Sequence, residues 1–546
     1  MKIGLKKFIS ILLTLVMISS MIFSLSSCFG GENDGQGGEN GGNTPHVPVP
    51  DPTDDNYRTF YQIFVGSFSD GNGDGIGDLQ GIINRIDYLN DGDITGGDDL
   101  GVQGIWLSPI FSSPSYHKYD AKDYYQIDWR FGEEKTLKEL VDLCHQRNVK
   151  VILDLVINHT SSQNVWFTEF KTARMNGDTS NKYYDYYTCV TSDERVGGRT
   201  YQKIAGVDAY YEVNFSGDMP ELNYDNPEVY EEMLNVAKYY LDLGVDGFRF
   251  DAIKYIYYGD MKANIAFWDK YMADLEAYAP DIYCVGECWS GESEVLQYVP
   301  ELNCFNFTTS GAESAFVKAA KGFSIANYLG YVESYQDKVQ AAGANRMPMS
   351  FLTNHDMDRI AGTFVVDTQM RMCAALYLLS PGSPMIYYGE EIGIRGSRGS
   401  ANTDANRRLA MLWGDDDHIK DPIGTTYSKD KQISTTVASQ LQDENSLLRA
   451  YQEIISVRNR YPAIARGDYN SVTTSNKNFG GFYIEYNGEI FGLFHNTSTE
   501  TITIDLSTVK NLDGHSFSTV LESVCGEATL NGTTLTISPQ SSVLLK

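Results

Sequence analysis

Residues 247–254 read Gly-Phe-Arg-Phe-Asp-Ala-Ile-Lys and place Arg249 two positions before Asp251 at the end of an apolar run. Successive side chains of a β-strand point to opposite faces, so these two charges share one face of the predicted strand. An arginine beside an aspartate favours the ionised carboxylate, which is the form that a nucleophile needs. The segment therefore predicts a reactive carboxylate at the C-terminal end of a strand.

Two further carboxylates also follow short apolar segments. Glu287 follows the apolar residues 282–285 after one glycine, and Asp356 ends Phe-Leu-Thr-Asn-His-Asp at residues 351–356. The C-terminal ends of barrel strands gather catalytic residues on one face. Since paired carboxyl groups are the machinery of glycoside hydrolysis, the three acids predict a glycosidase on a β/α barrel.

At this point the chain resembles the α-amylase superfamily, glycoside hydrolase family 13, from about residue 57 to its C-terminus. The resemblance implies that Asp251 is the nucleophile, Glu287 the general acid/base and Asp356 the stabiliser of the transition state. It also implies a double displacement that retains the anomeric configuration.

The predicted fold class is α/β: a (β/α)8 TIM barrel with an inserted domain B after the third strand and a C-terminal antiparallel β domain. Short β-rich apolar runs alternate with helical patterns, which is typical of βα units. Helices are expected at residues 136–147 and 227–243. The eight expected strands lie at residues 60–65, 104–108, 151–156, 246–250, 282–285, 304–307, 350–352 and 385–388.

The domain organisation follows from segment lengths and turn signals. The stretch between the third strand and Pro227 is too long for a simple loop, which indicates an insertion. The turns Asn487-Gly488 and Asn531-Gly532 predict β-hairpins. The predicted parts are a signal peptide at 1–27, a Gly/Pro-rich tether at 28–56, the barrel at 57–159 and 226–464, domain B at 160–225 and the β domain at 465–546.

The N-terminus has the pattern of an export signal. Three lysines precede an apolar stretch at residues 8–23, and Leu-Ser-Ser-Cys at 25–28 resembles a bacterial lipoprotein cleavage box. This predicts lipidation of Cys28 and attachment to the outer face of the bacterial cell membrane, with a plain signal peptide as the alternative. A Gly-rich stretch at 30–43 then predicts a flexible tether.

The charge and the cysteine content of the chain limit the kinds of ligand and partner that it is expected to bind. A formal net charge of −29 argues against nucleic acid and against direct binding to anionic lipid headgroups, so the membrane is expected only through the lipid anchor. The expected partner is starch or a maltooligosaccharide. The seven cysteines other than Cys28 are scattered without a C-x-x-C pair and predict neither a disulfide framework nor a zinc site. Four of them lie in or beside apolar runs and are expected to be buried, namely Cys284, Cys288, Cys304 and Cys373.

Residues 70–78 read Asp-Gly-Asn-Gly-Asp-Gly-Ile-Gly-Asp, with candidate oxygen ligands at every second position. Calcium takes six to eight such oxygens, and glycines let a short loop wrap around it. The family resemblance implies a Ca²⁺ site formed by Asp70, Asn72, Asp74, Asp78 and the Ile76 carbonyl. A series of Asx turns without metal is the alternative.

The resemblance also implies a set of substrate contacts. Tyr119 would stack on the sugar beside the cleaved bond, Lys254 would contact the acceptor side, and Arg359 would support the site through an ion pair. Lys118 replaces a family glycine, so its side chain is expected to reach toward the cleft. The predicted substrate-binding residues are His117, Tyr119, His159, Arg249, Lys254, His355, Asp404 and Arg408.

Two further residues depart from the family pattern. Glu221 stands where the family has an aspartate, and Tyr255 stands where a histidine usually follows the motif lysine. Both positions belong to a second calcium site in relatives, which puts that site in doubt here.

The predicted activity is endo-acting hydrolysis of internal α-1,4 bonds in starch and maltooligosaccharides, because surface tethering favours long substrates. A neopullulanase or cyclomaltodextrinase, an α-glucosidase and a 4-α-glucanotransferase remain alternatives on the same fold. A non-catalytic glucan-binding protein is a remote alternative, since such proteins lack the catalytic carboxylates that are all present here.

Overall fold

The structure is a computed structural model that describes residues 55–93, 97–343 and 346–546. These described residues all belong to one compact unit. The predicted signal peptide, the lipidation at Cys28 and nearly all of the predicted tether lie outside the described residues. Within the described ranges, no helix has both the length and the apolar character needed to cross a bilayer.

Seven parallel strands form the central sheet, in the spatial order β11-β10-β9-β5-β2-β1-β12. Single parallel bridges from Phe305 to Met349 and from Phe351 to Met385 join the two edges, so residues 349–351 take the place of the missing strand. The catalytic part is therefore a (β/α)8 barrel, as predicted. The seven strands are β1 (Phe60–Ile63), β2 (Gly104–Leu107), β5 (Lys150–Leu155), β9 (Gly247–Phe250), β10 (Tyr283–Gly286), β11 (Asn303–Cys304) and β12 (Met385–Tyr387).

Two of the eight predicted strands are weaker than expected. β11 stops at Cys304 because Asn306 caps a short 3-10 helix, η3 (Phe307–Thr309), through a hydrogen bond from Thr308 N–H. The segment predicted at residues 350–352 makes only the two isolated bridges. Pro348 precedes it and has no N–H group to donate to a ladder, which limits pairing at that end.

The two helices predicted from the sequence are both present, within two residues of their predicted bounds. α6 (Pro227–Asp242) begins after Asn226, whose side chain accepts a hydrogen bond from Glu228 N–H, with Pro227 in the first turn. α4 (Glu134–His145) begins two residues before its predicted start. The other helices are α2 (Leu79–Asn84), α3 (Ile86–Leu89), α5 (Val165–Asn176), α7 (Met261–Tyr278), α8 (Glu292–Tyr298), α9 (Ala315–Ala320), α10 (Ala326–Ala342), α11 (Asp367–Leu378), α12 (Val437–Leu441), α13 (Leu447–Arg460) and α14 (Pro462–Arg466).

Large side chains from the strands fill the interior of the barrel. Phe60, Trp106 and Tyr283 are all nearly fully buried in one apolar cluster. Trp106 stacks on Phe305 with ring centroids 5.4 Å apart. Gly104 leaves room for this packing, because a Cβ there would lie 2.4 Å from the Phe60 ring. The core is thus packed beneath the strand ends, where the predicted site residues lie.

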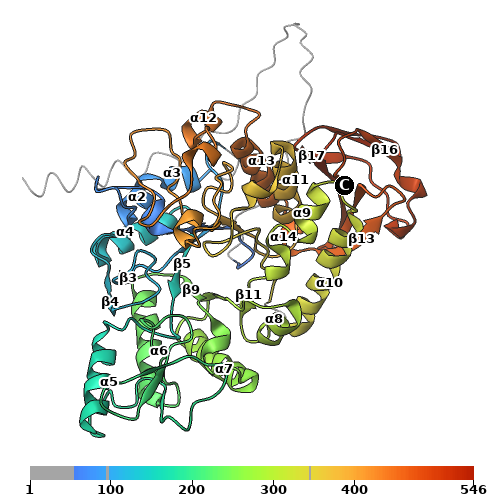
Figure 1. The fold of residues 1–546 in the computed structure, drawn as a ribbon. Helices are drawn as coiled ribbons and strands as arrows, with labels where there is room; N and C mark the ends of the chain where they lie inside the picture. The colour runs from blue at the N-terminus through green and yellow to red at the C-terminus, as the bar shows by residue number, and fades with distance from the viewer. Residues whose placement is uncertain (1–54, 94–96, 344–345) are drawn as a thin grey trace, which may run out of the picture. The chain divides into compact units, whose positions relative to one another are not determined.

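The stretch between β5 and α6 folds into α5 and a small three-stranded sheet (Figure 1). Its strands are β6 (Cys189–Val190), β7 (Tyr201–Lys203) and β8 (Tyr210–Glu212), with β8 in the middle. A bridge between His159 and Glu221 ties the two ends of this stretch together. Another small sheet pairs β3 (Phe111–Ser112) with β4 (Asp123–Ile127). The exact domain boundaries stay a prediction.

The C-terminal part contains two antiparallel sheets (Figure 1). Both predicted hairpins are present: β14 pairs with β15, and β18 with β19. Asn487 and Gly488 have φ of 51° and 79°, the left-handed conformation that a tight hairpin turn requires. The strands are β13 (Asp468–Thr473), β14 (Phe479–Tyr486), β15 (Glu489–Asn496), β16 (Ile502–Asp505), β17 (Val520–Val524), β18 (Ala528–Asn531), β19 (Thr534–Ile537) and β20 (Ser541–Leu545).

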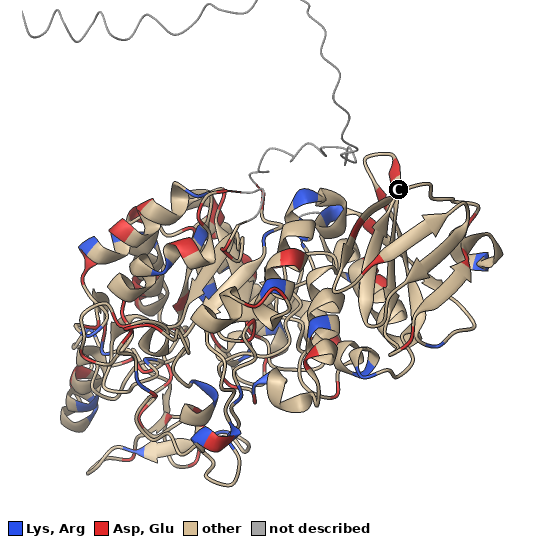
Figure 2. Cartoon of the chain, turned by 90° about the horizontal axis from the view of Figure 1, so that it is seen from above, with Lys and Arg blue, Asp and Glu red and all other residues tan. Residues whose placement is uncertain are grey.

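Charge and cysteine placement follow the sequence. Acidic and basic residues are interspersed along the described ribbon (Figure 2), so the net charge of −29 is not confined to one segment. The four cysteines predicted to be buried, Cys284, Cys288, Cys304 and Cys373, are all buried and free.

Candidate active site

A hollow of about 680 Å³ opens at the C-terminal ends of the barrel strands. Most of the predicted catalytic and substrate-binding residues line it, from segments that are far apart in the sequence. These are His117, Tyr119, His159, Asp251, Lys254, Glu287, Asp356, Asp404 and Arg408. The two remaining predicted residues, Arg249 and His355, are fully buried and contact the lining carboxylates.

Arg249 is the centre of the buried ionic network. Its Nη1 lies 2.8 Å from Asp154 Oδ1 and 2.7 Å from Asp251 Oδ1, and its Nη2 lies 3.1 Å from Glu287 Oε2. Strand pairing sets this geometry, because Arg249 on β9 is in register with Asp154 on β5 and with Val285 on β10. One guanidinium therefore holds three carboxyl groups of neighbouring strands.

The environment of Glu287 suits a proton donor. Burial raises the pKa of its carboxyl from 4.5 to about 7, while Arg249 lowers it and Asp251 raises it further. A carboxyl with a pKa near 7 carries a proton in a large fraction of molecules at neutral pH. It can therefore act as a general acid and, once deprotonated, as a general base.

Burial affects the pKa of Asp251 in a way that the sequence did not reveal. Burial raises the pKa of Asp251 above its ordinary value, although Arg249 and a hydrogen bond with Glu287 both lower it. The sequence argument considered only the arginine, whose influence is real but smaller than that of desolvation. The hydrogen bond with Glu287 favours the state in which Glu287 holds the proton and Asp251 is ionised.

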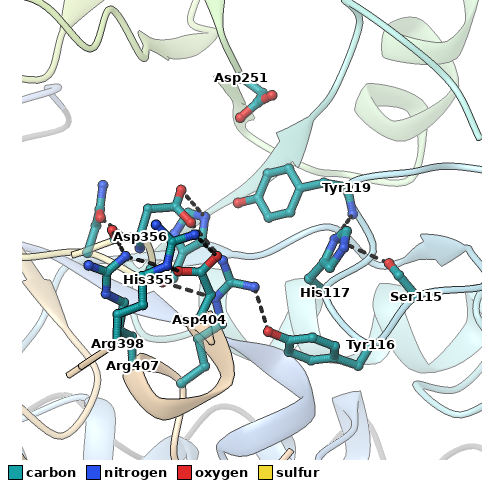
Figure 3. A network of polar contacts seen from close by, with 12 residues as sticks. Ser115, Tyr116, His117, Tyr119, Asp251, His355, Asp356, Arg398, Asp404 and Arg407 are labelled. Carbon is teal, nitrogen blue, oxygen red and sulfur yellow. Dashed lines mark hydrogen bonds and ion pairs between the residues drawn. The ribbon is translucent and has the colours of Figure 1, made fainter. Parts of the chain in front are cut away.

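Asp356 lies in a different electrostatic setting. Arg408 Nη2 lies 2.7 Å from its Oδ1. His355 Nε2 lies 3.1 Å from its Oδ2, and Figure 3 labels both of these residues. Burial raises the pKa of Asp356, but His355, Arg408 and Arg249 outweigh burial and hold it well below its usual range. Asp356 is thus ionised at neutral pH, where Glu287 still carries a proton in a large fraction of molecules.

Tyr119 is fixed at the wall of the hollow. Its hydroxyl donates to Asp154 Oδ2 over 2.7 Å, and its ring stacks on His355 with centroids 5.2 Å apart and an angle of 8°. Tyr119 lies between His355 and Asp251 in Figure 3. Its ring offers a flat apolar surface beside the carboxylates, and its stacking on a sugar stays a prediction.

Two predicted histidines also line the hollow and are held by hydrogen bonds. His117 Nδ1 accepts from Tyr119 N–H at 3.1 Å, and His159 Nε2 lies 3.1 Å from the Tyr119 carbonyl oxygen. Burial lowers the pKa of each imidazole to about 4. Both rings are therefore neutral at pH 7 and interact with a ligand as hydrogen-bonding groups rather than as cations.

The expectation that Lys118 reaches toward the cleft is wrong. Lys118 has φ of 68°, is buried, and places Nζ 2.7 Å from Asp128 Oδ2, so the side chain does not line the hollow. The left-handed backbone explains why this position tolerates glycine. Asp128, in the turn after β4, holds the ammonium away from the hollow.

The outer residues of the site differ in how they are held. Lys254 Nζ donates to the Trp289 carbonyl at 2.9 Å. Asp404 pairs with Arg398 and Arg407 (Figure 3). The predicted ion pair of Arg359 is wrong: its contacts include the carbonyls of Tyr388 and Arg407 and the faces of Tyr387 and Tyr388, and no ion pair to it is found within the described ranges.

Sequence reasoning missed the aromatic walls of the hollow. Trp289 is 48% exposed and stacks on Phe307 with centroids 5.1 Å apart. Phe215 packs against His159 and Tyr255, at 5.2 and 4.8 Å. Trp289 stands two residues after Glu287, and this spacing could have indicated a shared face. Phe215 belongs to the long stretch before α6, where no periodic pattern points to the site.

The predicted calcium loop is built from successive Asx turns. Asp70 Oδ1 accepts from Gly73 N–H at 2.6 Å, and Asp74 Oδ1 accepts from Ile76 N–H at 2.7 Å. Asp78 Oδ1 accepts from Gly81 N–H at 2.6 Å and caps α2. Hydrogen bonds between the side chains and the backbone of the loop therefore account for its conformation.

The oxygen atoms of this loop fit a calcium ion only in part. Asp78 Oδ2 is buried without a hydrogen-bond partner in the structure, and hard oxygen atoms of this kind are what calcium prefers. No three His, Cys, Asp or Glu side chains among the described residues are placed to hold a metal ion. The loop could hold calcium only if Asn72 and the Ile76 carbonyl also supplied ligands.

Comparison with known proteins agrees with this geometry. The catalytic domain of the α-amylases, as a sequence family, matches residues 62–467. The chain belongs to the α-amylase family. The hollow and the three carboxylates lie within the matched range, and so do the strands of the central sheet except for the first two residues of β1.

Individual relatives within the family differ in their named activities. The chain is 34% identical to Alpha-amylase 3 of Dictyoglomus thermophilum over 446 residues, which cover 80% of this chain and 84% of the relative. It is 33% identical to a 4-alpha-glucanotransferase of Thermotoga neapolitana, covering 63% and 74%. The solved structure of Eubacterium rectale Amy13B superposes with a TM-score of 0.82 at 33% identity, covering 91% of this chain and 96% of that one.

Proposed function

We propose that this member of the α-amylase family is a retaining hydrolase that cuts internal α-1,4 bonds of starch and maltooligosaccharides. The observation that carries the proposal is the buried trio of Arg249, Asp251 and Glu287, in which a single guanidinium holds both carboxyl groups. A glycosidase of this kind needs one protonated and one ionised carboxyl side by side. The pKa of about 7 for Glu287 supplies the protonated partner.

In the proposed first step, Glu287 gives its proton to the glycosidic oxygen while Asp251 attacks the anomeric carbon. The bond to the leaving sugar breaks and a glycosyl ester with Asp251 forms. Glu287 is then ionised and removes a proton from a water molecule, which attacks the same carbon and frees Asp251. Two inversions at one carbon restore the α configuration in the product.

The other lining residues would position the sugar. Asp356, ionised because of Arg408 and His355, would accept hydrogen bonds from ring hydroxyls as positive charge develops on the sugar. Tyr119 would pack against the sugar ring, and the neutral His117 and His159 would bond to hydroxyl groups. Because Arg249 is fully buried, its proposed role is to position Asp251 and Glu287.

The proposal includes a location of the enzyme at the cell surface. Lipidation at Cys28, supported by the cleavage-box sequence, would hold the enzyme on the outer face of the cell membrane. Activity in the membrane fraction that becomes soluble in Cys28→Ala tests this. Wild-type activity found wholly in the culture supernatant as intact protein contradicts it.

Product analysis tests the chemistry. NMR of fresh products from maltopentaose should show α-anomers first, and amylose should lose viscosity much faster than it gains reducing ends. Initial β-anomers would contradict the double displacement. Release of single glucose units with nearly unchanged viscosity would contradict endo action and favour an α-glucosidase.

A 4-α-glucanotransferase is the second candidate. The aromatic walls formed by Trp289 and by Phe215 with Tyr255 favour it, because they offer a second sugar the stacking surfaces that water does not need. The 33% identical glucanotransferase relative supports it as well. Maltotriose separates the two: a transferase forms products longer than the substrate from the earliest times, whereas a hydrolase forms mainly maltose and glucose.

A further inference from the structure

A second hollow, of about 450 Å³, lies on the outer side of the barrel. It is formed by β4, by the turn that leads from β4 to α4, and by the C-terminal half of α6. None of its lining residues lines the hollow of about 680 Å³ that contains Asp251, Glu287 and Asp356, which is called the catalytic hollow below. The second hollow is therefore a separate feature of the surface.

Aromatic rings dominate one side of this hollow. Trp129 is 81% exposed and Tyr125 is 39% exposed, and both line it together with the half-buried Tyr239. Single exposed aromatic residues are ordinary, but three around one depression form a patch that favours binding. The energetic cost of exposing them to water points to a ligand with an apolar face.

The rings around the hollow are already held in place. Tyr125 packs edge-on against Tyr239 with centroids 5.3 Å apart. The Tyr239 hydroxyl donates to Glu134 Oε2 over 2.5 Å, and the Arg130 guanidinium lies 5.7 Å from the centre of the Trp129 ring. A ligand would meet the two tyrosines with little further ordering, which lowers the entropic cost of binding.

The polar groups of the hollow identify the chemical class of the ligand. Glu133, Glu134 and Gln126 are exposed and line it with acceptor oxygen atoms. Two carboxylates disfavour an anion such as a phosphate. Hydroxyl groups around a flat apolar face match both features, because they donate to carboxylates while the face packs on an aromatic ring. A neutral sugar chain is such a ligand.

We propose that this hollow is a second glucan-binding site, which holds two or three glucosyl units of an α-glucan chain outside the catalytic hollow. The choice of an α-glucan rests on the proposed function. A chain long enough to occupy both places gains from the higher effective concentration at the catalytic hollow, whereas a trisaccharide cannot. Trp129 and Tyr125 are thus positioned to favour polymers over short oligosaccharides.

The experiment compares the full-length double variant Trp129→Ala/Tyr125→Ala with Phe323→Ala. Phe323 is 60% exposed and lines neither hollow, so it is a matched aromatic control. Binding to amylopectin is measured by affinity electrophoresis in an Asp251→Asn background, where turnover does not interfere. The double variant should bind at least about tenfold more weakly, about 1.4 kcal/mol, and the control should bind like the parent.

Kinetics on two substrates complete the test. The double variant should lose several-fold in kcat/KM on amylopectin and stay within about twofold of wild type on maltotriose, with an unchanged melting temperature. The variant Trp129→Phe/Tyr125→Phe should keep most of the binding. Undiminished amylopectin binding by the double variant, or an equal loss on both substrates, overturns the second site. Amylopectin binding that depends on Trp129 in a chain that cleaves no glucan would support the site and refute the proposed hydrolase.

Discussion

The catalytic hollow and the loop at residues 70–78 are both rich in acidic side chains, yet they hold them in opposite ways. In the hollow, Asp251 and Glu287 are buried and share the Arg249 guanidinium. In the loop, Asp74 is exposed and its carboxylate accepts a backbone N–H group. The number of acids is similar, so burial and the nature of the partner decide which acids can exchange protons near neutral pH.

The largest effect should come from removing the charge of a buried acid. Asp251→Asn and Glu287→Gln should each lower kcat by at least about a thousandfold, because each removes a group that acts only in the transition state. Initial rates on maltopentaose measure this. Asp74→Asn is the matched change in the exposed loop and should stay within about twofold of wild type. Either active-site variant with more than about a tenth of the wild-type rate contradicts the assignment.

Removing the shared cation should have the next largest effect. Arg249→Met leaves Asp154, Asp251 and Glu287 buried without their positive partner, which should cost about 3–5 kcal/mol of stability. Lys138→Met breaks an exposed pair with Asp142 and should cost less than about 1 kcal/mol. Urea unfolding at pH 7 measures both.

The pH dependence of Arg249→Met gives an internal check. Without the arginine, the folded-state pKa values of the three acids rise further above those of the unfolded chain. Near pH 4 the three carboxyl groups are protonated and neutral, so the variant should lose little stability relative to wild type. The loss should grow as the pH rises through the folded-state pKa values, because the buried carboxylates then lack their cation. A deficit that is equal at pH 4 and pH 8 would show that Arg249 acts through packing alone.

Much of the catalytic centre could be predicted from the sequence because strand geometry fixes it. Asp251 and Glu287 each follow a short apolar strand, and parallel strands in a barrel bring such positions together. Apolar runs in the sequence located most of the strands, and the Asn-Gly turns located both hairpins. These features depend on neighbours in sequence, which periodicity and turn residues report directly.

The predictions that were wrong concern side chains whose contacts come from other segments of the chain. Lys118 pairs with Asp128, and Arg359 bonds to carbonyls after β12, neither of which a local pattern reveals. The raised pKa of Asp251 depends on burial, which the pair Arg249–Asp251 does not show by itself. Phe215 reaches the hollow only because the stretch before α6 folds back onto the barrel.

A smaller and graded effect should come from pH acting on the wild-type enzyme. Burial raises the pKa of Glu287 from 4.5 to about 7, and catalysis needs its protonated form. kcat/KM should therefore fall about tenfold per pH step of one above about pH 7. On the acid side it should fall once Asp251 is protonated, starting above the ordinary range because the pKa of Asp251 is also raised. An alkaline limb near pH 4.5 would contradict the assigned acid.

The smallest expected effect concerns Asp78, the loop residue that most resembles the catalytic acids. It is buried, and desolvation together with Asp70 and Asp74 raises its pKa, while hydrogen bonds from Gly81 and Gly71 lower it. Its folded pKa lies above the unfolded value, so without a cation it lowers stability as the pH rises through the folded value. A bound calcium ion would reverse this by favouring the ionised form.

The proposed calcium site is tested by Asp78→Asn, which keeps a capping oxygen for α2 and removes the charge. At pH 7.5, free calcium at roughly five times Kd should stabilise the wild type by about 1 kcal/mol, or about 1 °C in melting temperature. In chelator the variant should be at least as stable as wild type, and it should not respond to calcium. Asp178→Asn alters an exposed Asx turn and should leave the calcium response intact. A wild type that melts identically with calcium and with chelator would show that the loop is held by its Asx turns alone.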